Sequence, residues 1–295
     1  MAESFVQAEL ASQPECWRQA ARIAAAVSEG LPEPGERVAV LGCGTSWFMA
    51  QSYAVLRESS GAGVTDAFAA SEFPRTRDYD RVVAITRSGT TTEVLRVLDE
   101  LDGQVTTTVL TGVPDAVAGR AGHVVDLSFC DERSVVQTRF ATTALALLRA
   151  HNGADLTGVI EQAEQLLTAT SESVLLDAEQ ISFLGRGWTV GLAHEAALKI
   201  REAANGWTES YPALEYRHGP ISIAKHGRVT WMFGVAPDGL ADEVKATGAT
   251  FVPTSTDPMV ELLAAQRLAV ALAFRSGLDP DRPRHLNRSV VLGTS

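Results

Sequence analysis

The chain has 295 residues, of which 45% are apolar and 21% are charged. This length and composition are typical of a globular protein with two ordinary domains or one large one, and they exclude a fibrous or largely disordered chain. The net charge of -11, from 25 Lys and Arg against 36 Asp and Glu, argues against nucleic acid or an anionic membrane as a partner. A small phosphate ester can still bind, because backbone N–H groups and hydroxyls can hold it locally.

The cysteines, Cys16, Cys43 and Cys130, are odd in number and lack the C-x-x-C spacing, so they indicate neither a disulfide framework nor a thiolate zinc site. The N-terminus lacks a basic flank followed by an apolar stretch, and no apolar run approaches the length of a membrane-spanning helix. We therefore expect a cytoplasmic protein that is neither secreted nor embedded in a membrane.

The first predicted element is a helical arm over residues 5–29, which Pro32 and the pair Pro34-Gly35 bring to an end. After this arm, short runs rich in β-branched residues alternate with helix-compatible stretches. The predicted strands are 37–41, 81–86, 105–110 and 123–127, and the predicted helices are 47–57, 92–101 and 141–150. Such alternation favours crossover units and a parallel sheet.

A polar passage over residues 151–157 precedes a predicted long helix, 159–176, and the pattern then begins again. The second series consists of strands 180–184 and 228–235 and helices 189–205, 241–246 and 259–274. Residues 40–44 and 183–187 both place an apolar strand end before Gly-x-Gly and a helix, which suggests two copies of one α/β unit. We expect an N-terminal arm over 1–29, a first subdomain over 30–156 and a second subdomain over 157–295.

A turn with the sequence Gly-Cys-Gly-Thr-Ser, residues 42–46, lies where a strand should end and a helix should begin. Glycines permit a tight turn, and hydroxyls with N–H groups at a helix N-terminus suit an anion. The dinucleotide fingerprint is not met, because Trp47 occupies the position of its third glycine. Taken alone, the segment is explained equally well by a capped helix without a ligand.

A second turn, Thr-Arg-Ser-Gly-Thr-Thr-Thr over residues 86–92, repeats this arrangement after another predicted strand. Ligands in open α/β sheets bind outside the carboxyl ends of the strands, where two such turns can converge. The five hydroxyls of this turn and the guanidinium of Arg87 match the acceptor oxygens of a phosphate monoester. The two turns together favour a phosphate site over an N-cap with surplus threonines.

A charged stripe runs along the predicted helix 189–205, because Glu195, Lys199 and Glu202 recur on one face of it. The stripe could line a pocket, but a solvent-exposed face with an i,i+4 ion pair is the more common reason for this spacing. Leu198 stands where H-E-x-x-H requires its second histidine, which excludes the zinc-protease motif.

His218 lies in a turn signal, residues 217–220, and an imidazole is well suited to proton transfer near neutral pH. A histidine in a loop is more often structural or solvated, so the turn alone assigns it no role.

Taken together, these segments resemble the sugar isomerase (SIS) family, and in particular the isomerase half of glucosamine-6-phosphate synthase and the related aminosugar-6-phosphate deaminases. The similarity spans nearly the whole chain, and its segments are 9–14, 42–46, 71–73, 87–89, 134–139, 195–202, 218–220 and 279–289. The resemblance implies an α/β fold with two SIS subdomains, each a three-layer α/β/α sandwich with a mainly parallel sheet.

The resemblance also implies a site for a sugar phosphate. The residues it assigns to substrate binding are Gly44, Thr45, Ser46, Thr86, Arg87, Ser88, Thr91, Gln137, Glu195 and Lys199. Glu202 aligns with the carboxylate that moves a proton between carbons 1 and 2 of the sugar. His218 aligns with a histidine credited with ring opening, which reaches in from a neighbouring subunit. We therefore expect a homodimer with the active site at the subunit interface, and neither a metal nor a cofactor.

Arg288 is the third residue with an implied catalytic role, and here the chain departs from the family pattern. The synthase has at this position a lysine that can form a Schiff base with the sugar. A guanidinium stays protonated and cannot form that bond, although it can still bind the sugar or stabilise negative charge. This departure fits a non-covalent isomerase or deaminase better than a synthase.

The function implied is that of a phosphosugar aldose–ketose isomerase, most specifically an aminosugar-6-phosphate deaminase that releases ammonia and a ketose 6-phosphate. Glutamine-dependent synthesis is not expected, because only about 30 residues precede the first predicted strand and leave no room for a glutaminase domain. Two alternatives stay open: a deglycase of fructosyl-amine 6-phosphates, and a phosphosugar sensor without turnover. The presence of both Glu202 and His218 favours catalysis over the sensor.

Overall fold

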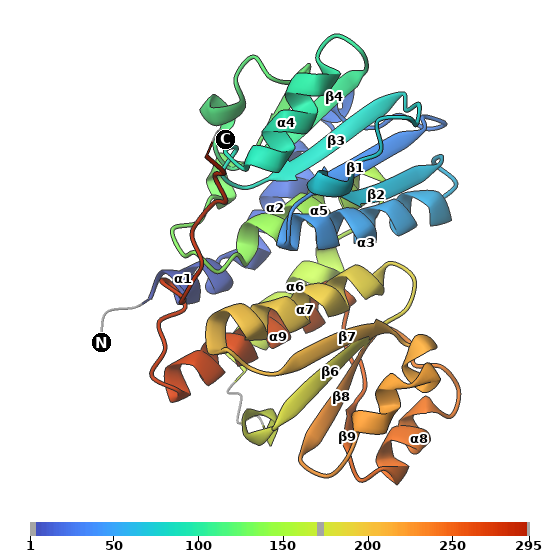
Figure 1. Ribbon diagram of the computed structural model, residues 1–295, viewed down its shortest axis with the longest axis vertical. Helices are drawn as coiled ribbons and strands as arrows, with labels where there is room; N and C mark the ends of the chain where they lie inside the picture. Colours follow the sequence, from blue (N-terminus) through green and yellow to red (C-terminus); the bar gives the residue numbers. More distant parts are fainter. Residues whose placement is uncertain (1–3, 170–173, 294–295) are drawn as a thin grey trace. The chain divides into compact units, whose positions relative to one another are not determined.

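The computed structural model describes residues 4–169 and 174–293. The described chain divides into two compact units, each built around its own sheet (Figure 1). The first-sheet unit comprises residues 12–133, 137–157 and 287–293, and the second-sheet unit comprises residues 4–11, 134–136 and 158–286. Each described sheet is parallel and covered by helices, so the predicted α/β fold is confirmed.

The sheet of the first-sheet unit has the order β2-β1-β3-β4-β5, with every neighbouring pair parallel. Its strands are β1 (Val38–Gly42), β2 (Thr65–Ala69), β3 (Arg81–Thr86), β4 (Thr106–Thr111) and β5 (His123–Asp126). Its helices are α2 (Gln13–Ile23), α3 (Thr45–Ser59), α4 (Thr92–Leu101) and α5 (Arg139–His151). Helix α4 covers one face of the sheet, while α2, α5 and α3 lie on the other (Figure 1).

Apolar side chains explain why this sheet forms where it does. Strands β1 and β3 are buried at every position, as expected for parallel strands that are covered on both faces. Leu41, Val82 and Val109 project from three neighbouring strands into one core with Leu98 of α4. Full burial of each such side chain contributes about 1.5–3 kcal/mol to the stability of the fold.

The sheet of the second-sheet unit has the order β7-β6-β8-β9 and is likewise parallel. Its strands are β6 (Gln180–Gly185), β7 (Thr208–Pro212), β8 (Arg228–Phe233) and β9 (Thr250–Val252). Its helices are α1 (Phe5–Ala11), α6 (Thr157–Thr168), α7 (Thr189–Ala204), α8 (Leu240–Ala246) and α9 (Pro258–Arg275). Helices α7 and α9 pack together on one face, and α8 covers the other through a core that contains Leu184, Met232 and Leu240.

The two sheets share one strand order, since β7-β6-β8-β9 repeats β2-β1-β3-β4. Each central strand also ends in a glycine that a following helix approaches closely. A Cβ atom on Gly42 would lie 2.6 Å from Cβ of Ser46, and a Cβ atom on Gly185 would lie 2.4 Å from the carbonyl oxygen of Thr189. No larger residue fits at either position, which supports the interpretation of the chain as two copies of one α/β unit.

Three strands, β2, β7 and β9, were not predicted from the sequence, and each lies at the edge of its sheet. Their side chains are mostly half-buried or exposed, and the sequences Thr-Asp-Ala-Phe-Ala and Thr-Glu-Ser-Tyr-Pro carry polar or charged residues. An edge strand is partly solvated, so it lacks the continuous apolar run by which a central parallel strand is recognised.

Two helix predictions were too long. The arm over 5–29 is interrupted at Ser12, and α2 then starts afresh with Pro14 in its first turn, a position that proline favours. The predicted helix 159–176 ends at Thr168, and Val174–Asp177 forms a 3₁₀ turn, while residues 170–173 lie outside the described residues. The subdomain boundaries predicted for 30–156 and 157–295 stay predictions.

Candidate functional site

The two hydroxyl-rich turns follow neighbouring strands of the first sheet. Strands β1 and β3 pair in parallel, so the turns that follow Gly42 and Thr86 emerge at the same edge. The chain leaves β1 toward β2 on one side and returns to β3 on the other, which makes this pair of strands the topological switch point of the sheet. Open α/β sheets bind their ligands at such a point.

Several of the hydroxyl-bearing side chains in these turns are buried. Ser46, Thr86 and Ser88 are each less than one-tenth exposed. The Ser88 Oγ accepts hydrogen bonds from the backbone N–H and the hydroxyl of Thr90, at 3.2 and 3.1 Å. The hydroxyl of Thr86 is buried and has no hydrogen-bond partner in the part of the chain that the structure describes. Since a buried polar atom is nearly always satisfied in a working protein, Thr86 is suited to meet a ligand.

Three of the other predicted binding residues of this unit lie at the start of a helix, and a fourth has a side-chain oxygen without a hydrogen-bond partner among the described residues. Gly44 is the N-cap of α3 and has a positive φ, and Thr45 is the first residue of that helix. Thr91 is the N-cap of α4. Gln137 is half-buried, and among the described residues its side-chain oxygen has no hydrogen-bond partner.

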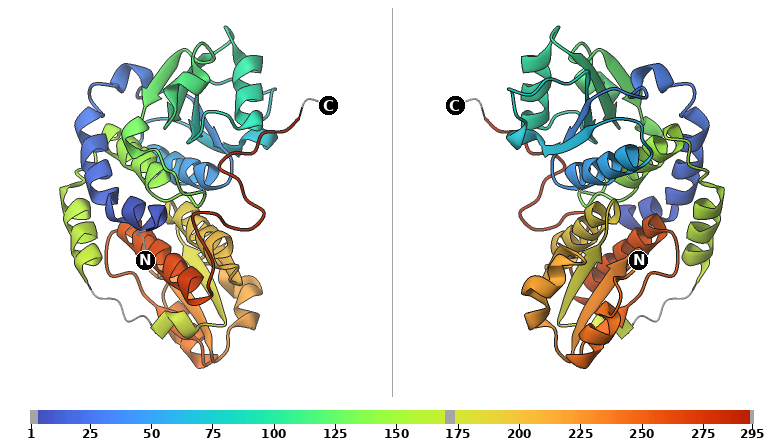
Figure 2. Two further views of the ribbon diagram at one scale, coloured as in Figure 1. Left: turned by 90° about the vertical axis from the view of Figure 1, so that its left-hand side faces the viewer. Right: turned by 90° about the vertical axis from the view of Figure 1, so that its right-hand side faces the viewer.

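Arg87 is buried, and its guanidinium meets the C-terminal tail of the chain. Its Nη2 donates to the carbonyl oxygen of Arg288 at 2.7 Å. The hydroxyls of Thr90 and Ser289 are hydrogen-bonded at 2.9 Å, and the backbone N–H of Thr92 donates to the carbonyl oxygen of Val290 at 3.2 Å. The tail, residues 287–293, therefore lies along the second turn as an extended segment without helix or strand (Figure 2).

The guanidinium of Arg288 is held by groups of the same unit. Its Nη2 lies 2.6 Å and 2.7 Å from the two carboxylate oxygens of Asp131, and its Nη1 donates to the carbonyl oxygen of Glu132. Asp131 was not among the site residues predicted from the sequence, and no local pattern indicates it, because the partners are 157 residues apart. A direct role of Arg288 at the sugar stays a prediction.

Cys43 lies inside the first turn and is half-buried. Burial raises the pKa of its thiol to about 11, and the nearby carboxylate of Glu93 contributes to the rise. The residue is therefore a neutral thiol near neutral pH, in keeping with a packing role rather than with that of a nucleophile.

In the second-sheet unit, the charged stripe of α7 is an inward-facing ion cluster. The Lys199 Nζ lies 3.4 Å from a carboxylate oxygen of Glu195 and hydrogen-bonds to the carboxylate of Glu202. The side chains of Lys199 and Glu195 are 1% and 0% exposed, whereas that of Glu202 is 20% exposed. The interpretation of this stripe as a solvent-exposed face is therefore wrong.

Glu202 is the member of this cluster that reaches an open space. It lines a pocket of about 190 Å³, to which Asn205, Arg282 and Arg284 also contribute. The carboxylate thus combines a buried ammonium partner on one side with access for a small molecule on the other.

Two histidines of this unit differ in their surroundings. His218 ends a 3₁₀ turn, Glu215–His218, and is exposed. His194 is half-buried on α7, with its Nδ1 2.9 Å from the hydroxyl of Ser210. Burial lowers the pKa of His194, and the nearby charge of Arg201 lowers it further. The imidazole of His218 is therefore accessible to a ligand or to a neighbouring chain. The imidazole of His194 is neutral near neutral pH and has a structural role.

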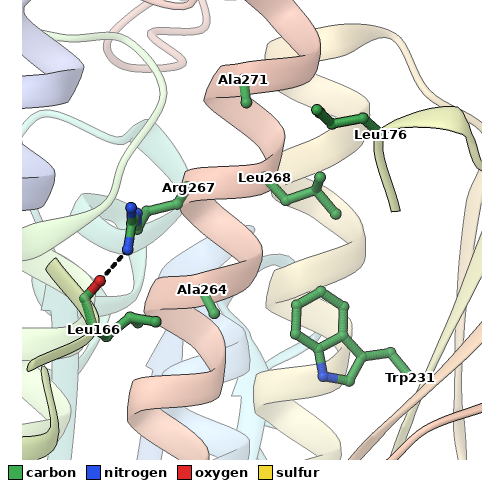
Figure 3. Close-up of a pocket in the computed structure, with 7 residues that line it drawn as sticks. All are labelled: Leu166, Leu176, Trp231, Ala264, Arg267, Leu268 and Ala271. Atoms are coloured by element: carbon green, nitrogen blue, oxygen red, sulfur yellow. Dashed lines mark hydrogen bonds between the residues drawn. The ribbon is translucent and has the colours of Figure 1, made fainter. Parts of the chain in front are cut away.

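A further pocket of the second-sheet unit, of about 200 Å³, lies beside α9 and is lined mainly by apolar groups such as Leu176, Trp231 and Leu268 (Figure 3). Its charged residue, Arg267, donates hydrogen bonds to the carbonyl oxygens of Leu166 and Ala169. The guanidinium therefore joins α9 to the end of α6, and we assign the pocket no ligand.

Neither a metal cluster nor a membrane span emerges from the described ranges, 4–169 and 174–293. No group of three or more His, Cys, Asp and Glu side chains gathers there closely enough to hold a metal ion. Within the same ranges, no helix combines the length and the apolar character needed to cross a bilayer.

The chain is similar in sequence to a set of curated enzymes. A glutamine–fructose-6-phosphate aminotransferase (isomerizing) from Sulfurisphaera tokodaii is 29% identical over 296 aligned residues, which cover 87% of this chain and 50% of the relative. The chain thus spans about half the length of the curated relatives it matches. No family model matches the chain.

Solved structures show the same fold. A glucosamine-6-phosphate deaminase from Thermotoga maritima superposes with a TM-score of 0.80 at 24% identity, covering 98% of this chain and 100% of that one. The C-terminal domain of a glucosamine-fructose-6-phosphate aminotransferase from Francisella tularensis gives a TM-score of 0.76 at 20% identity, covering 95% and 98%. The resemblance to the sugar isomerase family is confirmed.

Proposed function

We propose that the chain is a phosphosugar aldose–ketose isomerase, most specifically an aminosugar-6-phosphate deaminase. The observation that carries this proposal is the pair of hydroxyl-rich turns at the switch point of the first sheet, with the buried and unpartnered hydroxyl of Thr86 at its centre. The aminotransferase relatives and the T. maritima deaminase, whose names refer to phosphorylated hexoses, support it.

The first-sheet unit would bind the phosphate group of the substrate. Ser46, Thr86, Ser88 and Thr91 offer hydroxyls, and Arg87 offers a guanidinium whose Nη2 is already fixed by the tail. Gly44, Thr45 and Gln137 complete this set. Because the phosphate is remote from the reacting carbons, its binding energy can be used to orient them.

Glu202 would be the base that acts on the sugar. From the open-chain aminosugar it removes the proton on carbon 2 while the carbonyl oxygen on carbon 1 takes up a proton, which gives an enolamine. Return of the proton to carbon 1 and loss of a proton from the nitrogen then give the ketose imine. Water then adds to the imine carbon, the carbon–nitrogen bond breaks, and ammonia leaves with the ketose 6-phosphate. The buried Lys199, itself paired with Glu195, keeps the Glu202 carboxylate oriented.

His218 would open the sugar ring, and its exposed position on a turn suits a residue that acts on a neighbouring subunit. This part of the proposal requires a homodimer whose active site lies at the subunit interface. Arg288, whose guanidinium contacts Asp131, would bind the sugar or stabilise negative charge on it.

A second candidate is a deglycase of fructosyl-amine 6-phosphates, which would release a larger amine than ammonia. The pocket beside Glu202 favours it, because Arg282 and Arg284 are suited to bind a carboxylate carried by that amine. A sensor without turnover is the third reading, and the accessible carboxylate of Glu202 speaks against it.

The test is to measure ammonia and ketose 6-phosphate formed from glucosamine 6-phosphate, galactosamine 6-phosphate and fructosyl-lysine 6-phosphate. We expect turnover of an aminosugar phosphate that Glu202→Gln abolishes while substrate still binds. Glu179→Gln, which removes a carboxylate from an exposed ion pair with Lys225 in the same unit, is the matched control and should retain activity. Turnover of fructosyl-lysine 6-phosphate alone would establish the deglycase, and binding without any turnover would establish the sensor.

A further inference from the structure

The second sheet has a topological switch point of its own. In the order β7-β6-β8-β9, the chain leaves β6 toward β7 on one side and continues into β8 on the other. The pair β6 and β8 is therefore the counterpart of β1 and β3, whose carboxyl ends carry the hydroxyl-rich turns. Ligand sites of open α/β sheets lie outside the carboxyl ends of the strands at this point.

A pocket of about 470 Å³ opens at this place. Its walls come from the turn after β6, the turn after β8 and the segment that follows β9, so it is bounded by three successive strand ends of one unit. The volume lies within the range that small-molecule sites occupy, about 300–1,000 Å³.

The rim of this pocket is fixed by internal hydrogen bonds. The Thr189 Oγ1 accepts from the backbone N–H of Arg186 at 2.8 Å and donates to the carbonyl oxygen of Phe233 at 2.6 Å. On the other side, the Thr254 Oγ1 accepts from the backbone N–H of Gly234 at 2.7 Å. These bonds tie the three turns to one another, so the pocket keeps its shape without a ligand.

Two side chains give the pocket its chemistry, Arg186 and Trp188. Arg186 is exposed, and within the described residues its guanidinium has no hydrogen-bond or ion-pair partner. Trp188, the N-cap of α7, is half-buried and lines the same pocket with its indole side chain. Val235 and Pro258 add apolar surface, and none of the residues that line the pocket is acidic.

We propose that this pocket is a second ligand site, which binds a small phosphate ester that carries a ring. Arg186 would pair with the phosphate, for which a guanidinium has the matching geometry, and the ring would stack on Trp188. A phosphosugar and a nucleoside monophosphate share this chemistry. The inference does not depend on the proposed function, since none of the residues that line this pocket is assigned to the phosphosugar substrate.

Equilibrium binding by calorimetry tests the proposal. Fructose 6-phosphate and uridine 5′-monophosphate are titrated into the full chain carrying Ser88→Ala, which weakens the first-sheet turn. We expect at least one of the two to bind, and adding Arg186→Gln to weaken that binding about tenfold or more, as expected for loss of a charge-assisted pair. The probe that binds identifies the ligand as a sugar or a nucleoside phosphate.

Two controls make the result specific. Lys245→Gln removes a positive charge from the end of α8 in the same unit and should leave the affinity unchanged. Inorganic phosphate, which has no ring, should bind more weakly than the ester, and Trp188→Leu should reduce that difference. The proposal would be overturned if the Ser88→Ala chain bound neither ester. It would also be overturned if the ester that binds had the same affinity with and without Arg186. Turnover measured on an Arg186→Gln variant that keeps Ser88 separates this outcome from a failure of the proposed function.

Discussion

Arg288 holds Asp131 with one guanidinium nitrogen, at 2.6 Å and 2.7 Å from the two carboxylate oxygens. The same residue offers its carbonyl oxygen to Arg87 at 2.7 Å. The side chain of Arg288 thus fixes a tail whose backbone fixes the buried cation of the phosphate turn. Asp131 therefore acts on the proposed phosphate site through two intermediaries and is a positioning residue.

Replacing Asp131 by Asn should loosen the tail. Both partners are about one-third exposed, so the lost ion pair is worth at most about 1 kcal/mol, or about fivefold in an equilibrium constant. We expect KM for the phosphosugar to rise by about that factor while kcat changes little. Asp126→Asn, at the end of β5, is the control. A fall in kcat with unchanged KM would show instead that Arg288 acts on the reacting carbons.

Thr86→Val tests the unpartnered hydroxyl. Removing a buried polar atom that has no protein partner should leave the free energy of unfolding unchanged or raise it by about 1 kcal/mol, while phosphosugar binding weakens. Thr111→Val is the matched change at the end of the neighbouring strand β4. There the hydroxyl accepts from the Val113 N–H at 3.1 Å, so its loss should lower the free energy of unfolding by about 1 kcal/mol. Urea denaturation of both variants checks the difference in sign.

Lys199→Met tests the ion cluster of α7. The substitution leaves the carboxylate of Glu195 fully buried without its ammonium partner, which typically costs about 3–5 kcal/mol of stability. Combining it with Glu195→Gln should restore a large part of that loss, because no buried charge then remains at that position. Equal stability of the single and double variants in urea would mean that the two groups do not share one electrostatic environment.

His194 should make stability depend on pH. Because its pKa is lowered in the folded chain, the unfolded chain takes up a proton near the ordinary value of about 6.5 while the folded chain does not. The contribution of His194 to the free energy of unfolding is therefore fully present above about pH 6.5, and it decreases as the pH falls below that value. We expect the loss of stability between about pH 7.5 and 5.5 to be smaller in His194→Gln, which can still bond to Ser210. A variant with the same pH slope as the parent would contradict this.

The central strands could be predicted from the sequence because burial on both faces requires the apolar runs that β1 and β3 show. The adjacency of the two hydroxyl-rich turns could also be predicted from the sequence, because the carboxyl ends of neighbouring parallel strands lie at the same edge of a sheet. The pairing of Asp131 with Arg288 could not be predicted, because it joins distant segments through side chains that follow no periodic pattern. Nor could the burial of Lys199, since spacing along a helix does not tell which face the rest of the fold will cover.

The division into compact units has a practical consequence for cutting the chain. The backbone passes five times from one unit to the other, at residues 11–12, 133–134, 136–137, 157–158 and 286–287. A fragment that begins at residue 158 would lose α1, whose first backbone N–H groups, of Phe5 and Val6, donate to the carboxylate of Asp281 at 2.8 Å. A fragment that stops at residue 157 would lose the tail that contacts Arg87. Neither half can therefore be isolated by a single cut without removing part of its own fold.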